Sequence, residues 1–432
     1  MTRLLSWRFQ SALKSMSWPV LSILTMTTIQ GYVIAQDQLV QSLHLADKSF
    51  QVTKLTGIQG KQFEFSVATS LGNQTVTTQQ VVRWGSWRGI VGSQAVWMSD
   101  GSWLSGQVQL SNHTQLRLQS KWLNLPELPF RSIRAVVFTP TASLADWIAM
   151  EQTLKSFKGE NDVIWLRDRK QLTGVIELDS LSEDAKELSI KVADQKVSVP
   201  VEEIAAFAFS PSLFSEVSAE PALQIGIDDG SLLKSVEFSS ADGKANFVLP
   251  SLAKVASLDD TNEFARAVTF VEHHPIAKTQ RLDQLKPASY RHISDSTLEF
   301  DLGINEDVYG KPLVVGTQRH AGIVFHGLAM HGASQVAYRW DRSPAKLLAE
   351  LHMADPESNL GNALCKVMLV RNGKLETVWE ATVSADPASR KSCMPFEIDI
   401  TDAQLVVLVV EKGEQGQLGD HVLWLDARIA TR

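Results

Sequence analysis

Histidines and paired carboxylates are the residues of this 432-residue chain whose types could perform acid–base or metal chemistry. His320, His326 and His331 alternate faces on a predicted strand, so they do not form a metal triad. The pairs Glu202-Glu203 and Asp228-Asp229 are neighbours at predicted turns, whereas a glycosidase needs two carboxyl groups facing each other, about 5 to 9 Å apart. The sequence contains no zinc-protease, serine-hydrolase or phosphate-binding motif. We therefore find no catalytic constellation and predict a protein that is not an enzyme.

Composition excludes other classes of protein. The hydrophobic share of 44% and the charged share of 21% are typical of folded globular chains, and about 150 residues per domain would give about three domains. The net charge of −7 offers no basic surface for nucleic acid. Two cysteines are too few for a disulfide scaffold or a four-thiolate zinc site.

Residues 1–35 have the pattern of an export signal. Three basic residues precede a short apolar stretch, Trp18–Met26, and the small residues of Val33–Ala35 precede a cleavage point. The apolar stretch is shorter than the roughly 20 residues of a membrane span. We therefore predict cleavage, a secreted or periplasmic bacterial protein, and no membrane span after cleavage. The alternative is an uncleaved signal that anchors the chain.

The first part of the chain contains an internal repeat. The segment Val96–Leu110 aligns with Ile164–Leu178, and Gly106 matches Gly174. Alternating apolar residues around Asp-Gly turns predict hairpins, and a glycine inside the second strand predicts a bulge or a sharp bend. Each unit therefore resembles a small curled, SH3-like β-sheet. We place a degenerate unit at 42–92, further units at 93–141, 161–212 and 221–260, and a linker helix at 142–160.

Twelve tryptophans are an unusual number for this length. The repeat-matched Trp97 and Trp165 are predicted to be core residues of their strands, with a sugar- or peptide-stacking surface as the alternative. The loop Trp84–Gly89 carries two tryptophans and an arginine. It is either a contact surface or a loop packed on its own sheet. Trp103 and Trp122 also break the repeat pattern and are further surface candidates.

Three motifs occur in order in the last third of the chain: Leu282–Leu285, the glycine- and histidine-containing Gly327–His331, and Asp420–Ala427. An Asn372-Gly373 turn and the apolar strand Leu405–Val410 predict a sandwich of β-sheets around them. In these motifs the region 280–432 resembles the NPCBM family of carbohydrate-binding modules. The resemblance implies a β-sandwich of the galactose-binding-like, jelly-roll type and a cell-surface or extracellular glycan as its partner.

A sugar site needs an aromatic face for the ring and polar groups for the hydroxyls. Side chains of both kinds occur in the matching region, and each has a structural alternative as a buried imidazole, a turn cap or a core ring. The candidates for carbohydrate contact are His331, Trp340, Asp420, His421 and Trp424. A structural calcium ion, which is common in this fold type, would bind to Asp355, Glu357 and Asn359; we predict no other metal and no cofactor.

The two cysteines lie in this same region. In an oxidising compartment an isolated pair usually bridges, so we expect a disulfide between Cys365 and Cys393. The alternative is two unpaired, half-buried thiols.

The sequence thus predicts an all-β chain of tandem curled repeats followed by a β-sandwich. We expect an exported, non-enzymatic protein that binds carbohydrate through the sandwich, with the repeats as a scaffold or as contacts to other envelope proteins. One alternative is a glycan hydrolase that carries the module as an accessory; another is a structural envelope protein whose sandwich binds protein. Repeats and sandwich leave no room for a catalytic barrel of about 250 residues, which favours the first reading.

Overall fold

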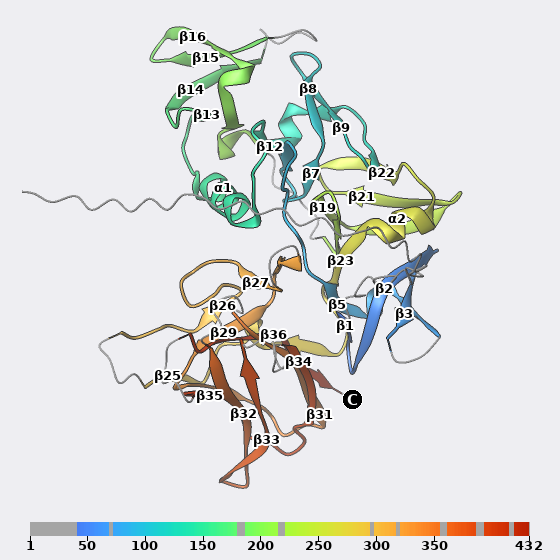
Figure 1. Ribbon diagram of the computed structural model, residues 1–432, viewed down its shortest axis with the longest axis vertical. Coiled ribbons are helices and arrows are strands. Elements are labelled where there is room, and N and C mark those ends of the chain that lie inside the picture. The colour runs from blue at the N-terminus through green and yellow to red at the C-terminus, as the bar shows by residue number, and fades with distance from the viewer. Residues whose placement is uncertain are drawn as a thin grey trace, which may run out of the picture. The chain divides into compact units, whose positions relative to one another are not determined.

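Strands make up nearly all of the regular structure in Figure 1. The computed structural model describes residues 41–68, 72–178, 186–214, 221–293, 298–316, 320–354, 361–385, 393–413 and 419–431, without the side chains of Ala253 and Cys393. The predicted export signal, residues 1–35, lies outside these ranges. Val40–Arg432 form one compact unit. Two α-helices occur in the described ranges, α1 (Leu144–Ser156) and α2 (Thr261–Ala267).

The strands of the N-terminal half join into one long hydrogen-bonded path. Within the described residues its order is β16 (Gln195–Pro200), β15 (Glu187–Val192), β14 (Gln171–Glu177), β13 (Asp162–Leu166), β17 (Ile204–Ala208), β12 (Ile133–Val137), β6 (Ala95–Met98), β7 (Trp103–Ser105), β19 (Leu232–Ser235), β18 (Leu223–Ile227), β23 (Val268–His273), β5 (Val81–Gly85), β1 (Gln41–Leu45), β2 (Ser49–Gln59), β3 (Gln62–Val67) and β4 (Asn73–Thr77). Two short sheets pack beside it. One is β10 (Leu123–Asn124), β22 (Leu252–Ser257), β21 (Lys244–Leu249) and β20 (Glu237–Ala241); the other is β11 (Leu128–Pro129), β9 (Gln115–Gln119) and β8 (Gln107–Leu110).

The path crosses the boundaries of the predicted repeat units. Ala135 of β12 pairs with Ala208 of β17, and Leu232 of β19 pairs with Trp103 of β7. Hydrogen bonds therefore join the units edge to edge, which leaves fewer strand edges exposed than separate open sheets would. The SH3-like character of the single units stays a prediction.

The repeat-matched glycines have the same role in both units. A Cβ atom at Gly106 would lie 2.4 Å from the carbonyl oxygen of Gln119, and one at Gly174 would lie 2.1 Å from that of Lys191. Another strand thus approaches both backbones too closely for any side chain. The Asp-Gly turn at Gly101, which has φ +85°, connects β6 to β7 and confirms the predicted hairpin.

Tryptophans form the core between α1 and the long sheet. Trp97 is buried and stacks on Trp103 with ring centroids 5.3 Å apart, which confirms that Trp97 is a core residue. Trp165 is half-buried. Trp84 and Trp87 are at most 4% exposed, so their loop packs against the fold, as the second of the two interpretations expected. The predicted surface role of Trp103 is wrong, because it is 1% exposed, and Trp122 is half-buried. Large rings fill the wide space between a helix and a sheet better than aliphatic side chains do.

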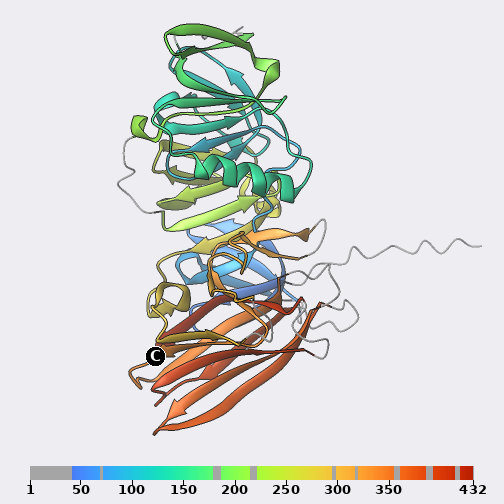
Figure 2. The same ribbon diagram turned by 90° about the vertical axis from the view of Figure 1, so that its left-hand side faces the viewer.

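The C-terminal region is a sandwich of two antiparallel sheets (Figure 2). The first has the order β26 (Gly303–Ile304), β29 (Gly327–His331), β36 (His421–Thr431), β31 (Ala345–Met353) and β34 (Cys393–Asp399), with β24 (Thr279–Arg281) paired to β36. The second has the order β25 (Ser289–His292), β30 (Ser334–Arg339), β35 (Leu405–Glu411), β32 (Asn362–Arg371) and β33 (Lys374–Ser384). The pairing of Arg371 with Lys374 confirms the Asn372-Gly373 hairpin.

The two faces of β36 have different partners. Val422 and Trp424 face the sandwich core, whereas Leu423 and Leu425 pack on the outer face of the sheet. A separate hairpin covers that outer face, made of β27 (Leu313–Val315) and β28 (Gly322–Val324). The outer face is thus an interface with other parts of the chain over most of its length.

The expected disulfide does not form, and Cys365 is a free, buried thiol. Cys365 lies on β32 of the second sheet, while Cys393 begins β34 of the first sheet. Packed sheets are about 10 Å apart, and a disulfide needs Cα atoms within about 7 Å. The prediction failed because sequence spacing does not tell which sheet a strand joins.

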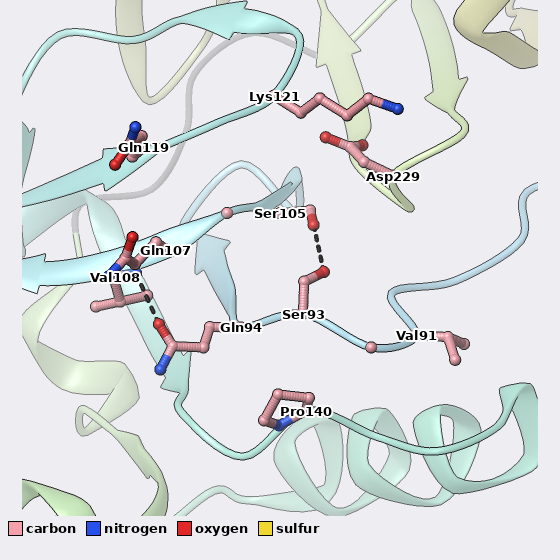
Figure 3. A pocket seen from close by; sticks show the side chains of 12 residues that line it. Val91, Ser93, Gln94, Ser105, Gln107, Val108, Gln119, Lys121, Pro140 and Asp229 are labelled. Atoms are coloured by element: carbon pink, nitrogen blue, oxygen red, sulfur yellow. Dashed lines mark hydrogen bonds between the residues drawn. The ribbon is translucent and has the colours of Figure 1, made fainter.

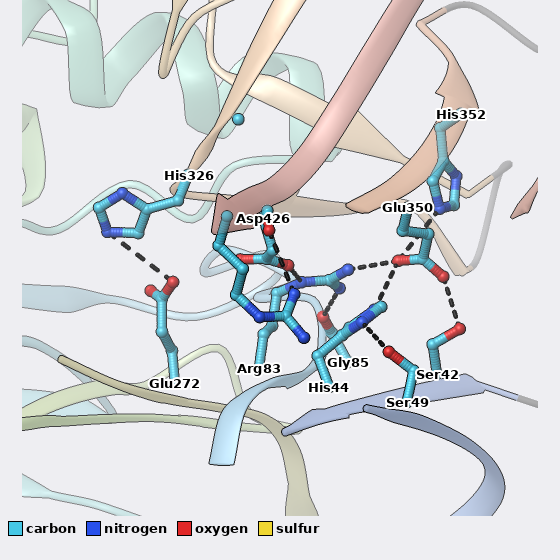
Figure 4. Close-up of polar contacts among 12 residues, drawn as sticks. Ser42, His44, Ser49, Arg83, Gly85, Glu272, His326, Glu350, His352 and Asp426 are labelled. Carbon is cyan, nitrogen blue, oxygen red and sulfur yellow. Dashed lines mark hydrogen bonds and ion pairs between the residues drawn. The ribbon is translucent and has the colours of Figure 1, made fainter. Parts of the chain in front are cut away.

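A buried ion cluster joins the N-terminal sheet to the outer face of the first sandwich sheet (Figure 4). Arg83 of β5 donates to the carboxylates of Glu350 and Asp426, and also to the carbonyl oxygen of Gly85 at 2.7 Å. The side chains of Arg83, Glu350 and Asp426 are at most 5% exposed. His44 of β1 contacts Glu350 through Nε2 at 3.1 Å. These four residues are called the ion cluster below.

Opposite charges keep this cluster ionised despite its burial. Burial alone would raise the pKa of Asp426, but the Arg83 guanidinium lowers it to about 2. Burial would likewise raise the pKa of Glu350, and the same guanidinium helps to hold it well below its usual value. Burial lowers the pKa of His44, so its imidazole is neutral at neutral pH. The carboxylates are therefore ionised and paired in the folded chain.

Candidate functional site

Five aromatic side chains gather at one end of the first sandwich sheet. They are called the aromatic cluster: His292, Phe300, Tyr309, His331 and His421. His331 ends β29 and His421 begins β36, and the two are direct strand partners with ring centroids 4.7 Å apart. Phe300 stacks on His331 at 4.2 Å with the rings 6° from parallel. The cluster thus consists of ring faces and imidazole nitrogens.

Tyr309 is the most exposed member of the cluster. Its side chain is 60% exposed, and its ring centroid lies 5.1 Å from that of His421. The turn that carries it is held by Asp307, whose Oδ1 accepts the backbone N–H groups of Tyr309 and Lys311, both at 2.8 Å. Asn305 fixes the start of the turn by two hydrogen bonds to Gly327. A large exposed aromatic ring is therefore held in a defined position.

The hydrogen bonds define the proton positions on two of the imidazoles. His331 Nδ1 lies 3.1 Å from the carbonyl oxygen of Gly332, so Nδ1 carries the hydrogen and Nε2 accepts. Burial lowers the pKa of His331, which is neutral at pH 7. His292 Nδ1 accepts the backbone N–H of Phe300 at 3.2 Å. These neutral rings favour an uncharged ligand that offers C–H groups and hydroxyls.

Asp420, a predicted contact residue, bonds through its side chain to the backbone of two other segments. Its side chain is buried, and its carboxylate accepts the backbone N–H groups of Asn362 at 2.9 Å and Gly413 at 2.8 Å. Burial raises its pKa. The carboxylate therefore positions the strand that begins with His421.

The predicted sugar role of Trp424 is wrong, because its side chain is 0% exposed and lies in the sandwich core against Phe396. Trp340 is half-buried and follows the far end of β30, where its Nε1 donates to the carbonyl oxygen of Ser343 at 3.0 Å. It lies apart from the aromatic cluster. Of the five predicted residues, only His331 and His421 belong to the cluster.

Sequence reasoning missed Tyr309, Phe300 and His292. Tyr309 had a recognisable signal, since it is an aromatic residue in a polar Asp-Val-Tyr-Gly turn, and the chain has only four tyrosines. Phe300 and His292 had no such signal, because they come from segments that reach His331 only through the fold.

The structure gives no support for a metal site. Within the described ranges, no group of three or more His, Cys, Asp or Glu side chains is arranged to hold a metal ion. The calcium candidates Asp355, Glu357 and Asn359 lie outside the described residues. No helix of the described part is long and apolar enough to cross a membrane.

A cavity of about 550 Å³ lies in the N-terminal half (Figure 3). Several polar side chains in its lining are already hydrogen-bonded: Ser93 bonds to Ser105 at 2.7 Å, and Gln94 accepts the backbone N–H of Val108 at 2.8 Å. Its lining residues include no aromatic ring. The aromatic cluster therefore fits a sugar ring better than this cavity does.

Comparison with family models matches residues 278–430 to the NPCBM/NEW2 domain. The matched range contains the sandwich from β24 to β36, except for the last residue of β36, and all of the aromatic cluster. Residues 278–430 carry an NPCBM domain. Comparison with curated proteins finds no match.

Solved carbohydrate-binding modules resemble parts of the chain. A CBM51 module from Clostridium perfringens GH95, in complex with methyl-galactose, is 15% identical and covers 35% of this chain and 99% of its own, with a TM-score of 0.29. The tandem CBM51 modules of Sp3GH98 from Streptococcus pneumoniae are 12% identical and cover 65% and 91%, also at 0.29. The CBM51-2 and INT domains of Clostridium perfringens ZmpB are 15% identical, and this chain spans 40% of their length at a TM-score of 0.30.

Proposed function

We propose that this chain is an exported, non-enzymatic protein that binds a glycan through the aromatic cluster of its NPCBM domain. The observation that carries the proposal is the exposed ring of Tyr309, held beside His331 and His421 in a domain of a carbohydrate-binding family. The N-terminal sheet would serve as the scaffold that presents this domain, and as the contact surface for other envelope proteins.

The chemistry of the cluster suits a pyranose ring. The face of Tyr309 packs on the C–H side of a sugar, as aromatic side chains do in wet, partly apolar sites. The Tyr309 hydroxyl lies 3.3 Å from His421 Nε2, so a sugar hydroxyl can join an existing donor–acceptor pair. His331 Nε2 offers a further acceptor. The Tyr309 hydroxyl and the His331 imidazole are uncharged at neutral pH, because burial raises the pKa of the first and lowers that of the second, so neutral sugars are favoured over anionic ones.

A binding measurement with a matched pair of variants tests the proposal. Glycan arrays on the full chain identify ligands, and calorimetry with the best ligand then compares Tyr309→Ala with Leu375→Ala. Leu375 is similarly exposed, at 57%, but it follows the Asn372-Gly373 turn after β32. The opposite end of β32 begins with Asn362, whose backbone N–H bonds to Asp420. We expect Tyr309→Ala to weaken binding at least tenfold and Leu375→Ala to leave it unchanged.

The alternatives predict other results. Equal affinity of the two variants would refute the cluster as the site, and an array with no bound glycan but a captured envelope protein would favour the protein-binding alternative. Release of reducing sugar from polysaccharides, abolished by a single carboxylate substitution, would show an enzyme. The export proposal expects a mature chain that begins near Gln36, which N-terminal sequencing of the protein from its native cell measures.

A further inference from the structure

We propose that helix α1 forms a second wall of the glycan site, so that the site accepts a chain of at least two sugar residues. The inference rests on the proposed function, and it assigns the second sugar to a cavity between α1 and the NPCBM domain. This cavity has a volume of about 250 Å³. It is distinct from the aromatic cluster but adjoins it.

One wall of the cavity is a single face of α1. Its lining residues are Ala145, Ile148, Ala149 and Gln152, which follow the i, i+3, i+4, i+7 spacing of one helix face. The opposite face of α1, with Trp147, Glu151 and Leu154, is buried in the N-terminal half. Ala145, Ala149 and Gln152 are exposed, and Ile148 is half-buried. This helix face is thus mostly apolar, and its two alanines leave room for a ligand.

The other wall continues directly into the aromatic cluster. Asp307 and Lys311 line the cavity, and Tyr309 lies between them on the same turn. Leu423 also lines the cavity, two residues along β36 from His421. Side chains two residues apart on a strand point to the same face and lie about 7 Å apart. The cavity wall at the buried Leu423 is therefore about 7 Å from His421, so a sugar on Tyr309 and His421 lies next to the cavity.

A chain of aromatic contacts fixes α1 over the NPCBM domain. Trp147 of α1 packs edge-to-face on Trp87 with ring centroids 6.0 Å apart. Trp87 forms two backbone hydrogen bonds with Ile323 of β28, at 2.9 and 2.6 Å, and stacks on Phe325 at 5.9 Å. Because β28 belongs to the hairpin that covers the outer face, the cavity has two firmly held walls. The two walls are thus set before a ligand arrives, which lowers the entropy cost of binding.

The size and lining of the cavity specify the class of ligand. A volume of about 250 Å³ lies near the lower limit of about 300 Å³ for small-molecule pockets, which suits one sugar residue rather than a longer chain. Val314 and Ile148, both half-buried, offer apolar surface to ring C–H groups. Gln152 and Lys311 offer hydrogen-bond donors for hydroxyls. The expected ligand is a neutral oligosaccharide, of which two neighbouring sugar residues are bound.

Calorimetry with paired sugars tests the inference. The probes are galactose with β1,4-galactobiose, glucose with cellobiose, and N-acetylglucosamine with chitobiose. The full chain should bind one disaccharide at least tenfold more tightly than its monosaccharide. Ala149→Trp, which fills the cavity from an exposed position, should remove this advantage and leave monosaccharide affinity unchanged. The matched control is Ala241→Trp, because Ala241 is exposed at the end of β20 and does not line the cavity. This variant should bind both sugars as the native chain does.

The outcomes separate the inference from the proposed function. Loss of both monosaccharide and disaccharide binding in Tyr309→Ala, with only the disaccharide advantage lost in Ala149→Trp, supports both. Equal binding of monosaccharide and disaccharide, or an Ala149→Trp variant that keeps the advantage, overturns the second wall while the cluster stands. Binding that Tyr309→Ala does not change overturns the proposed function. Circular dichroism of each variant establishes that the comparison is between folded chains.

Discussion

Replacement of Arg83 by methionine tests whether the ion cluster holds the N-terminal sheet on the NPCBM domain. Methionine keeps the apolar part of the side chain and removes the charge. Asp426 then loses the hydrogen bond that its Oδ2 accepts from Arg83, while Oδ1 has no hydrogen-bond partner among the described residues. Glu350 keeps Ser42 Oγ at 2.6 Å and His44 Nε2 at 3.1 Å. One fully buried carboxylate thus loses its paired guanidinium, and its remaining countercharges are Arg281 and Arg428, which do not hydrogen-bond to it through their side chains.

The expected loss is about 3–5 kcal/mol in the free energy of unfolding, the cost of leaving a partner of a buried ion pair uncompensated. A native chain is stable by about 5–15 kcal/mol, so the variant should unfold at a urea concentration lower by about 1–2 M. Tryptophan fluorescence follows the transition, because the chain has 12 tryptophans. The variant should also be cleaved faster by a protease between the N-terminal sheet and residue 278.

A surface pair provides the control. Arg117 bonds to Glu127 at 2.9 Å, but the two side chains are 52% and 34% exposed. Arg117→Met should therefore cost less than about 1 kcal/mol. The double variant with Arg83→Met and Asp426→Asn should be about 1–3 kcal/mol more stable than the sum of the two single effects predicts, because the buried carboxylate charge is also removed. An Arg83→Met variant as stable as Arg117→Met would refute the reasoning.

Three further predictions concern titration, the buried thiol and the positioning carboxylate. His44 is neutral when folded but protonates near pH 6.5 when unfolded, so its contribution to stability falls as pH drops below about 6.5; His44→Gln should flatten the measured slope of unfolding free energy between pH 6.5 and 5. Burial raises the pKa of Cys365, so in a Cys393→Ala background its thiol should react with a disulfide reagent at pH 8 only after unfolding, and reaction in the folded chain would contradict its burial. Asp420→Ala leaves two buried N–H groups unpaired and should lower stability by about 2–4 kcal/mol in urea titration; an unchanged midpoint would show that the carboxylate does not hold the strand ends.

The ion cluster and His326 also make the free energy of unfolding depend on pH. The pKa values of Glu350 and Asp426 are depressed when folded, so their contribution is present at neutral pH and is lost as pH falls below about 4 through the folded pKa values. His326 has the opposite sign. Burial would lower its pKa, but Glu272 and Asp283 raise it, so its contribution is lost as pH rises above about 6.5.

The sequence by itself determined the parts of this protein that depend on local pattern. Alternating residues around Gly101 and Gly373 specify hairpins, because those turns need positive φ, and both hairpins form. The C-terminal motifs were enough to identify the NPCBM domain, which the family model matches at 278–430. They also made His331 and His421 candidates for carbohydrate contact, and the two prove to be direct strand partners.

Only the tertiary structure decided which residues meet. Trp424 and Asp420 carry family motifs but face the core and the backbone, since a motif is equally useful for holding a fold. Tyr309 and Phe300 join the histidines, and α1 lies over the cavity, because segments far apart in sequence pack on one sheet face. Pairing between distant strands depends on the burial of whole faces, and no short stretch of residues encodes it.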